Sequence, residues 1–262
     1  SSQYDNSIGV KTSSYPSSSP ISGVFVGVGQ YGKAIRSIDN GGSWDNETCQ
    51  ILTDLNGVTS GNNTFVAVGD NGIVLRSTDN ASSFSSVSPY YTGTSRGVTF
   101  GNNTFLGVSD GGKTGRSIDN ASSWNNSTSG ISTTLYGVTF GNNTFVAVGQ
   151  SGKILRSTDN ASSWNNSTSP ITSRLYGVTF GNNTFVAVGQ SGKILRSTDN
   201  ASSWDNSTSG ISTTLKGVTF GNNTFVAVGD NGIVLRSTDN ASSWNNSTSP
   251  ITTDLNGVTF SE

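Results

Sequence analysis

Residues with carboxylate, hydroxyl and guanidinium groups occur together in one nine-residue segment of this sequence. The segment recurs every forty residues. The phrase reads Arg-Ser-Thr-Asp-Asn-Ala-Ser-Ser-Trp at residues 156–164. An aspartate flanked by serines and preceded by an arginine has the groups needed for acid–base chemistry or for binding a cation. The aspartates of the six copies are Asp39, Asp79, Asp119, Asp159, Asp199 and Asp239.

The remaining reactive side chains are few. The chain has no histidine, so the commonest general base is missing, and its only glutamates are Glu47 and Glu262. The single cysteine, Cys49, excludes an internal disulfide and is either a free thiol or paired with another chain. The aspartates recur without a clustered ligand spacing. The sequence therefore predicts no catalytic residues, no metal site and no cofactor.

Charge and composition exclude further classes of function. With 14 basic and 16 acidic residues in 262, the net charge is −2, so neither nucleic acid nor an anionic membrane surface is an expected partner. No apolar run approaches the roughly 20 residues of a membrane span. Only 31% of the residues are hydrophobic, but they keep fixed places in each repeat, which a disordered chain would not do. The lack of methionine and the Ser-Ser-Gln start predict either a mature chain from which a leader has been removed or a chain trimmed for expression. We expect the protein to be secreted or displayed at the cell surface.

Short strands must position these groups. In the copy at residues 135–169, strands are predicted at 135–140, 145–148 and 154–156, and Trp164 begins a fourth. The second turn is Gln-Ser-Gly here and contains Asn71-Gly72 in another copy, a pair that favours a type I′ hairpin. Four antiparallel strands per repeat and no helix predict an all-β fold, a six-bladed β-propeller. An open solenoid is the alternative and would need polar caps on its terminal repeats.

The two ends of the repeat array complement each other. The strand Gly-Val-Thr-Phe begins at residues 97, 137, 177, 217 and 257, but Ser-Ser-Ser-Pro stands at 17–20. The first repeat therefore lacks this strand, and the last has one to spare. A ring closed by pairing residues 257–260 with the first blade would have six four-stranded blades and no exposed edge at the seam. The predicted organisation is an N-terminal arm or linker at 1–22 and the propeller at 23–262.

The spacing of Ser157, Asp159 and Trp164 resembles the Asp-box, or BNR, motif Ser-x-Asp-x-Gly-x-x-Trp. With the flanking Phe-Val-Ala-Val-Gly and Gly-Lys-Ile-Leu-Arg, residues 23–260 look similar to bacterial BNR-repeat propellers related to Ycf48. The resemblance implies that each aspartate caps its turn by accepting backbone N–H bonds and that each aromatic residue packs between blades. Alanine replaces the motif's glycine in five copies, so the turn must differ slightly or the preceding asparagine must take the positive φ. We expect the arginine and the aspartate of each copy to neutralise each other.

Sialidases also carry Asp-boxes, so a glycosidase is the enzyme class to test. Such enzymes need an arginine cluster for the substrate carboxylate and a Tyr–Glu pair with an acid at the mouth of the ring. Neither Glu47 nor Glu262 falls on a predicted inner strand. We therefore expect no enzyme activity.

Positions that differ between the repeats are the candidates for binding. They precede the Gly-Val-Thr-Phe strand, at the expected mouth of the central channel, where propellers often bind ligands. A mixed polar and aromatic ring there suits a peptide or a sugar, and the alternative is drift at exposed positions. The candidate residues are Asn56, Arg96, Tyr136, Tyr176, Lys216 and Asn256, with Asp54, Arg174 and Asp254 beside them.

Asn-x-Ser/Thr sequences are dense along the chain. In a secretory host they would accept N-linked glycans, and otherwise they reflect the preference of turns for Asn, Ser and Thr. The candidate sites are Asn62, Asn102, Asn126, Asn142, Asn166, Asn182, Asn206, Asn222 and Asn246.

The sequence thus predicts a non-catalytic, secreted or cell-surface propeller that acts as an assembly scaffold or recognises other proteins. The arm, which contains Ile8-Gly9-Val10, either adds to an outer strand of another copy and builds a filament or array, or is a disordered tail. A multivalent carbohydrate-binding lectin is one alternative. An assembly factor resembling Ycf48 is another, and it predicts a concentrated basic patch, which Arg96, Arg174 and Lys216 supply thinly.

Overall fold

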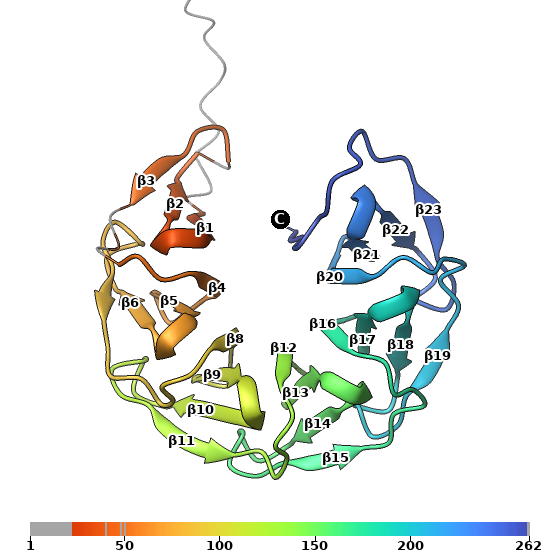
Figure 1. Ribbon diagram of the computed structural model, residues 1–262, viewed down its shortest axis with the longest axis horizontal. Helices are drawn as coiled ribbons and strands as arrows, with labels where there is room; N and C mark the ends of the chain where they lie inside the picture. The colour runs from red at the N-terminus through yellow and green to blue at the C-terminus, as the bar shows by residue number, and fades with distance from the viewer. Residues whose placement is uncertain (1–22, 40, 48, 50, 261–262) are drawn as a thin grey trace, which may run out of the picture.

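The computed structural model describes residues 23–39, 41–47, 49 and 51–260 and shows β-sheets arranged in an open ring, with a gap between the first and the last sheet (Figure 1). The predicted arm, residues 1–22, lies outside the described residues. Within the described part of the chain, six antiparallel sheets follow one another around a common centre. The prediction of an all-β, six-bladed propeller is confirmed, except that the first blade has three strands and the other five have four. No helix among these residues is long and apolar enough to cross a membrane.

Each complete blade runs from an inner strand at the centre to a short outer strand, and the blades follow the forty-residue period. The inner strands are β4 (Leu55–Gly61), β8 (Ser95–Gly101), β12 (Leu135–Gly141), β16 (Leu175–Gly181) and β20 (Leu215–Gly221). The second strands are β1 (Phe25–Val28), β5 (Thr64–Gly69), β9 (Thr104–Ser109), β13 (Thr144–Gly149), β17 (Thr184–Gly189) and β21 (Thr224–Gly229).

The third strands are β2 (Ala34–Ser37), β6 (Val74–Ser77), β10 (Lys113–Ser117), β14 (Ile154–Ser157), β18 (Ile194–Ser197) and β22 (Val234–Ser237). The outer strands are β3 (Asp45–Glu47), β7 (Ser85–Ser86), β11 (Asn125–Thr128), β15 (Asn165–Ser167), β19 (Asp205–Ser207) and β23 (Asn245–Ser247). Single 3-10 turns join the second and third strands: η1 (Gln30–Gly32), η2 (Asp70–Gly72), η3 (Asp110–Gly112), η4 (Gln150–Gly152), η5 (Gln190–Gly192) and η6 (Asp230–Gly232).

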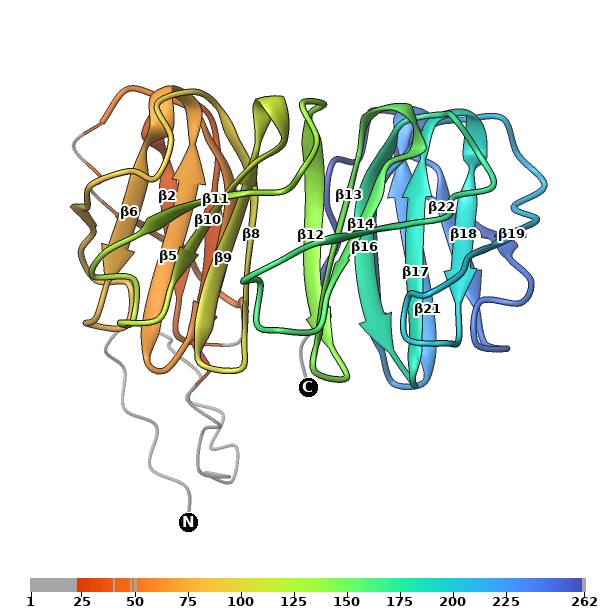
Figure 2. The ribbon, with the colours of Figure 1, turned by 90° about the horizontal axis from the view of Figure 1, so that it is seen from below.

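The core lies between the blades, on both faces of each sheet. Every residue of β13 is buried, because one blade covers each of its faces, so its sequence is a continuous apolar run with no alternation. Figure 2 shows the blades edge-on, with their strands running along the axis of the ring. The inner strands of neighbouring blades lie side by side. This places the two ends of the inner strands at the two mouths of the ring.

The turns use the backbone conformations that the sequence predicts. Asn71 and Gly72 in η2 both have positive φ, 55° and 74°, as a type I′ hairpin requires. A side chain at position 72 would meet the carbonyl of Tyr91, because a Cβ there would lie 2.2 Å from the oxygen. Glycine is therefore needed both for its φ and for the close approach of the next loop.

Asp159 caps the turn between the third and outer strands. Its Oδ1 accepts hydrogen bonds from the Ser163 amide at 2.9 Å and from the Ser157 hydroxyl at 2.8 Å. Ser157 Oγ in turn accepts the amide of Ala161 at 2.9 Å. Bonds from the hydroxyl and amide of Ser163 lower the pKa of Asp159 from 3.8 to about 2. This is the turn cap that the resemblance to the Asp-box motif implies. The implied packing of every box aromatic between blades does not hold in the first box, where Trp44 is 46% exposed.

Alanine at the motif's glycine position adopts the left-handed conformation itself. Asn160 and Ala161 both have φ of 61°, so the positive φ is not transferred to the asparagine but shared by both residues. A left-handed residue with a Cβ costs roughly 1–2 kcal/mol. The methyl group of Ala161 is fully buried in a cluster with Phe145 and Leu106, and this burial offsets part of that cost.

The arginines of the repeated phrase contact the next blade rather than their own aspartate. Arg156 Nε donates to the carbonyl of Asn200, 44 residues ahead, at 2.6 Å. Arg36, Arg76, Arg116 and Arg196 make the equivalent bond. None of the ion pairs within the described ranges joins a box arginine to a box aspartate. The expected local neutralisation is therefore wrong, because the guanidinium reaches across the blade interface.

The seam of the ring lies between the first and last blades. Residues 255–260 form no strand, and the described structure has no ladder between them and β1. The segment packs on β20 as an inner strand does elsewhere: a Cβ on Gly221 would lie 2.0 Å from Phe260 Cγ. On the other side, Thr259 lines a cavity together with residues 24–26 of the first blade. The closing strand thus lies at the seam without the predicted pairing, and closure stays a prediction.

Candidate functional site

The predicted ring residues stand at one mouth of the central channel. Five of them are the second residues of the inner strands, which surround the centre in Figure 1. The 3-10 turns lie at the same end, because the first residue of each inner strand pairs with the last residue of the second strand, just before the turn. Each ring residue therefore lies close to the first residue of a turn in its own blade. These five are Asn56, Arg96, Tyr136, Tyr176 and Lys216.

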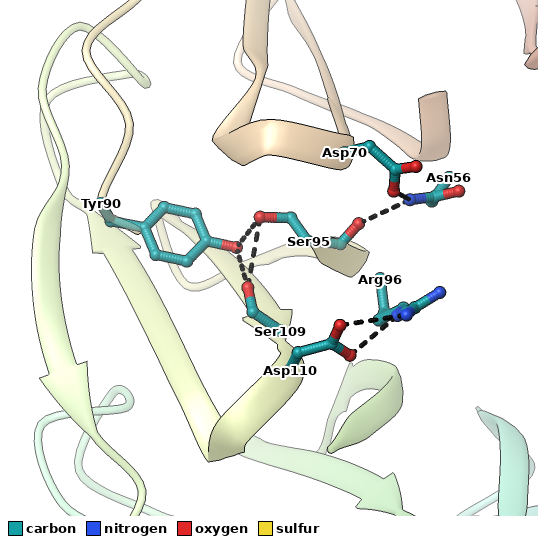
Figure 3. Close-up of polar contacts among 7 residues, drawn as sticks. All are labelled: Asn56, Asp70, Tyr90, Ser95, Arg96, Ser109 and Asp110. Carbon is teal, nitrogen blue, oxygen red and sulfur yellow. Dashed lines mark hydrogen bonds and ion pairs between the residues drawn. The ribbon is translucent and has the colours of Figure 1, made fainter. Parts of the chain in front are cut away.

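The cations of the ring are paired within their own blades. Arg96 makes a bidentate ion pair with Asp110, at 2.9 and 3.0 Å (Figure 3). The hydrogen bond to Asp110 is the main reason why the pKa of Arg96 is raised. Lys216 lies 2.7 Å from Asp230, and this contact is the first cause of its raised pKa. Both cations are thus neutralised locally, so they do not form an open basic patch.

Other bonds of the ring join one blade to the next. Asn56 Nδ2 donates to Asp70 Oδ1 at 2.9 Å and to the carbonyl of Ser95, in the following blade, at 3.0 Å (Figure 3). Lys216 Nζ contacts Asp254 at 3.0 Å and Asn256 at 3.2 Å, in the segment at the seam. The charged ring residues consequently form two polar clusters, one around Asn56 and Arg96 and one around Lys216.

The other half of the mouth is aromatic. The rings of Tyr136 and Tyr176 meet at a centroid distance of 5.3 Å and an angle of 51°. Arg174 is exposed beside them, and its hydrogen bond with Tyr176 is the first cause of its raised pKa. None of the ion pairs among the described residues includes Arg174. This half therefore presents two phenol rings in tilted contact and a cation without a carboxylate partner.

Two of the predicted residues serve mainly as turn caps. Asp54 Oδ1 accepts the amide of Tyr31 at 2.9 Å, and Asp254 Oδ1 accepts the amide of Asn231 at 3.1 Å. The Asn231 amide is the largest cause of the lowered pKa of Asp254, followed by Lys216. Each aspartate thus holds the turn of the preceding blade in place.

The sequence-based site omits the turn residues that complete the ring. Asp70, Asp110 and Asp230 occur in the blades whose inner strands carry Asn56, Arg96 and Lys216. The blades with tyrosine carry Gln150 and Gln190 at that position instead. This correlation between two positions fourteen residues apart is the feature of the sequence from which the turn residues could have been added to the site.

A buried tyrosine supports the charged half of the ring. Tyr90 is 5% exposed, and its hydroxyl lies 3.0 Å from both Ser95 Oγ and Ser109 Oγ (Figure 3). Burial raises the pKa of Tyr90. Its ring fills space left by Gly107 and Gly115, where a Cβ would lie 2.3 and 2.0 Å from Tyr90 atoms. The second, fourth, fifth and sixth blades carry alanine and leucine at these two positions, and the first carries Gly27 and Ile35, so Tyr90 and its neighbours differ from the repeat as a set.

The nine candidate glycan acceptors are all exposed asparagines. Five lie in the turns between inner and second strands, and four lie on outer strands. By contrast, Asn160 inside the box donates to Thr104 Oγ1 of the preceding blade at 2.7 Å. Among the residues that the structure describes, no group of three or more His, Cys, Asp or Glu side chains lies close enough to hold a metal ion.

Comparisons with known proteins identify the fold. No protein-family model and no curated protein sequence matches the chain. A solved structure of YCF48 bound to a D1 peptide is similar over 84% of this chain and 75% of that one, with a TM-score of 0.68 and 20% identity. YCF48 from Cyanidioschyzon merolae matches over 86% and 81%, with a TM-score of 0.68 and 18% identity. The WD40 propeller domain of Doa1 matches over 88% and 80%, with a TM-score of 0.69 and 13% identity. By these likenesses the chain is a β-propeller.

Proposed function

We propose that this protein is a non-catalytic scaffold that recognises another protein at the mouth lined by Tyr136, Tyr176 and Arg174. The observation that carries the proposal is a pair of tyrosine rings in tilted contact beside an arginine that has no carboxylate partner in the described ion pairs. Tyrosine and arginine are enriched at the energetic centres of protein interfaces. We name these three residues the aromatic half-ring.

The cations in the rest of the mouth are already paired with aspartates, which supports this assignment. Arg96 and Lys216 are already bound to aspartates of their own blades, so a partner would have to displace an existing ion pair to use them. Arg174 needs no such exchange. One of the similar structures, YCF48, is described as bound to a peptide, which agrees with a propeller of this kind recognising a polypeptide.

Site-specific photocross-linking tests the proposal. Benzoylphenylalanine at position 176 is expected to capture a protein from the native source, because its side chain occupies the aromatic half-ring. The same amino acid at position 84, in the box of the second blade, provides the matched control, since Phe84 lies at the outer side of the ring. Capture at position 84 with equal yield and the same product would contradict a partner-specific mouth.

A carbohydrate-binding role is the second candidate, and it rests on a different surface. Successive blades carry similar cavities at the outer rim, of about 190 and 420 Å³. Both are lined by serine, threonine and asparagine side chains and one lysine, Lys153 or Lys193. Repeated weak sites of this kind gain avidity when engaged together. A glycan array without binding at millimolar sugar would remove this candidate.

We further propose that the box turns relate the chain to Asp-box proteins and that the protein works in a secreted or surface setting. The capped turn at Asp159 supports the first point, and the nine exposed acceptor asparagines support the second. An intact mass from the native source tests the latter directly, because each N-linked glycan adds mass to the bare chain.

A further inference from the structure

One blade interface lacks an aromatic ring that the other interfaces contain. In four blades, the inner strand ends in a phenylalanine that packs on a phenylalanine of the second strand at a centroid distance of 4.6 Å. In the second blade the register is the same, but Ser60 stands opposite Phe65. The benzyl group that would cover Phe65 is missing.

A cavity occupies the place of that ring. It has a volume of about 160 Å³ and is lined by Val24, Phe25, Val26, Val58, Thr59, Ser60, Phe65 and Thr259. Phe65 is partly exposed, whereas its equivalents Phe105, Phe145, Phe185 and Phe225 have no exposed surface. A second cavity of about 250 Å³ shares Val24, Ser60 and Phe65 with it, and both are open to solvent on one side. The cavity lies at the position that a phenylalanine ring fills at the equivalent interfaces between the other blades.

The lining determines what kind of ring fits. None of the lining side chains carries a charge, so an ionic ligand would lose its hydration without gaining a partner. The polar groups are the hydroxyls of Thr59, Ser60 and Thr259, which can both donate and accept hydrogen bonds. Phe65 offers a ring face or edge for a tilted aromatic contact, as its equivalents do with their own phenylalanines.

We infer that this cavity binds a small, neutral molecule with one phenyl-sized ring bearing a hydroxyl group. The site is separate from the aromatic half-ring and does not depend on protein recognition there. It lies at the seam, between the first blade, the second blade and the segment that contains Thr259. A bound ring would therefore hold these three parts together, as Phe140 does between the third and fourth blades, where a Cβ on Gly101 would lie 2.0 Å from Phe140 Cγ.

Titration with phenol, followed by methyl NMR of the full chain, tests the inference. The methyl signals of Val26 and Val58 are expected to shift saturably, while those of Val98 and Val138, at equivalent positions beside an intact phenylalanine, stay in place. Cyclohexanol, which has a similar volume but no aromatic ring, is expected to bind more weakly. Equal shifts at all four valines, or none at Val26 and Val58, would overturn the inference.

Two substitutions make the test specific. Ser60→Phe restores the missing ring and is expected to weaken phenol binding at least tenfold. The reciprocal change, Phe140→Ser, creates the same gap in the fourth blade and is expected to add a second set of saturable shifts, at Val138. If Ser60→Phe does not fold, the Phe140→Ser result still decides the matter. Unchanged phenol affinity in folded Ser60→Phe, or no new shift at Val138 in folded Phe140→Ser, contradicts the assignment.

Discussion

The repeated aspartates use both carboxylate oxygens within their own turns. Asp159 Oδ1 accepts the amide of Ser163 and the hydroxyl of Ser157, and Oδ2 accepts the Ser163 hydroxyl at 2.5 Å. A carboxylate engaged in this way stabilises its turn. The repeated aspartate, whose setting in the sequence is compatible with acid–base chemistry, thus stabilises the backbone of its own turn.

Acid should destabilise the protein through these turns. The usual pKa of 3.8 falls to about 2 in folded Asp159, because its bonds favour the charged form. Between these values the unfolded chain binds more protons, so the stabilisation is present above about pH 4 and is lost as the pH falls through about 2. Free energies of unfolding measured from pH 5 to pH 2 should fall, and Asp159→Asn should reduce the slope. A slope unchanged by Asp159→Asn would contradict this role.

Tyr90→Phe should destabilise the protein while leaving the fold intact. The ring would still fill the space beside Gly107 and Gly115, but the hydroxyls of Ser95 and Ser109 would lose a buried partner. Loss of such a bond costs about 1–2 kcal/mol. Urea unfolding measures the change, with Tyr91→Phe as the control because Tyr91 is only partly buried. An equal loss of unfolding free energy in the two variants would contradict a stabilising role for the buried Tyr90 hydroxyl.

At the scale of elements, neighbouring blades are joined by a reciprocal pair of hydrogen bonds. Arg116 in β10 donates to the carbonyl of Asn160 in the next box, and the Asn160 side chain donates back to Thr104 in β9. The two bonds fix the box of one blade against the strands of the blade before it. The repeat therefore encodes blade-to-blade contacts as well as blade structure.

Thr104→Val tests this link. It removes the acceptor of the partly buried Asn160 amide group and should cost about 1–3 kcal/mol. Thr224→Val is the matched control, since Thr224 occupies the same strand position and makes the same local bond, to the Asn222 carbonyl, but accepts no hydrogen bond from another blade among the described residues. Chemical denaturation compares the two. If both variants lose the same stability, the local bond rather than the blade contact explains the effect.

Sequence patterns predicted the elements better than the contacts between them. The period, the apolar runs and the Asn-Gly turns determine local conformation, so strands and hairpins could be placed from them. The acceptor of Arg156 lies 44 residues away, and Tyr90 fills space left by glycines 17 and 25 positions later. Such contacts depend on how blades stack, which a single repeat does not contain. The ring at the mouth stays a prediction as a binding site, and the pairing of Arg96 with Asp110 was not foreseen.

At the scale of the whole molecule, closure of the ring decides whether the mouth is continuous. The paired strands of other blades match Thr59 with Val66 and Thr139 with Val146. The same register would place Thr259 opposite Val26, and these two residues already line one cavity. Pairing in this register would complete the first blade as a four-stranded sheet.

Engineered cysteines can detect this register. In a Cys49→Ala background, Val26→Cys with Thr259→Cys should oxidise to a disulfide, because directly opposed strand residues have Cα atoms about 4.5–5.5 Å apart. Val26→Cys with Val258→Cys should not, since adjacent residues point to opposite faces of the sheet. The intact mass after mild oxidation shows for each cysteine pair whether the disulfide has formed. Efficient cross-linking of the second pair alone would show a different register.

The central claim is that the residues repeated in every blade stabilise the propeller. The residues that differ between blades at the mouth bind the partner protein. The affinity of the purified partner captured at position 176 tests it most directly, measured by calorimetry. Arg174→Ala with Tyr176→Ala should weaken binding at least tenfold, whereas Asp159→Asn, in the repeated box, should leave the affinity unchanged in a folded protein. Full affinity in the first variant, or an equal loss in both, would contradict the account.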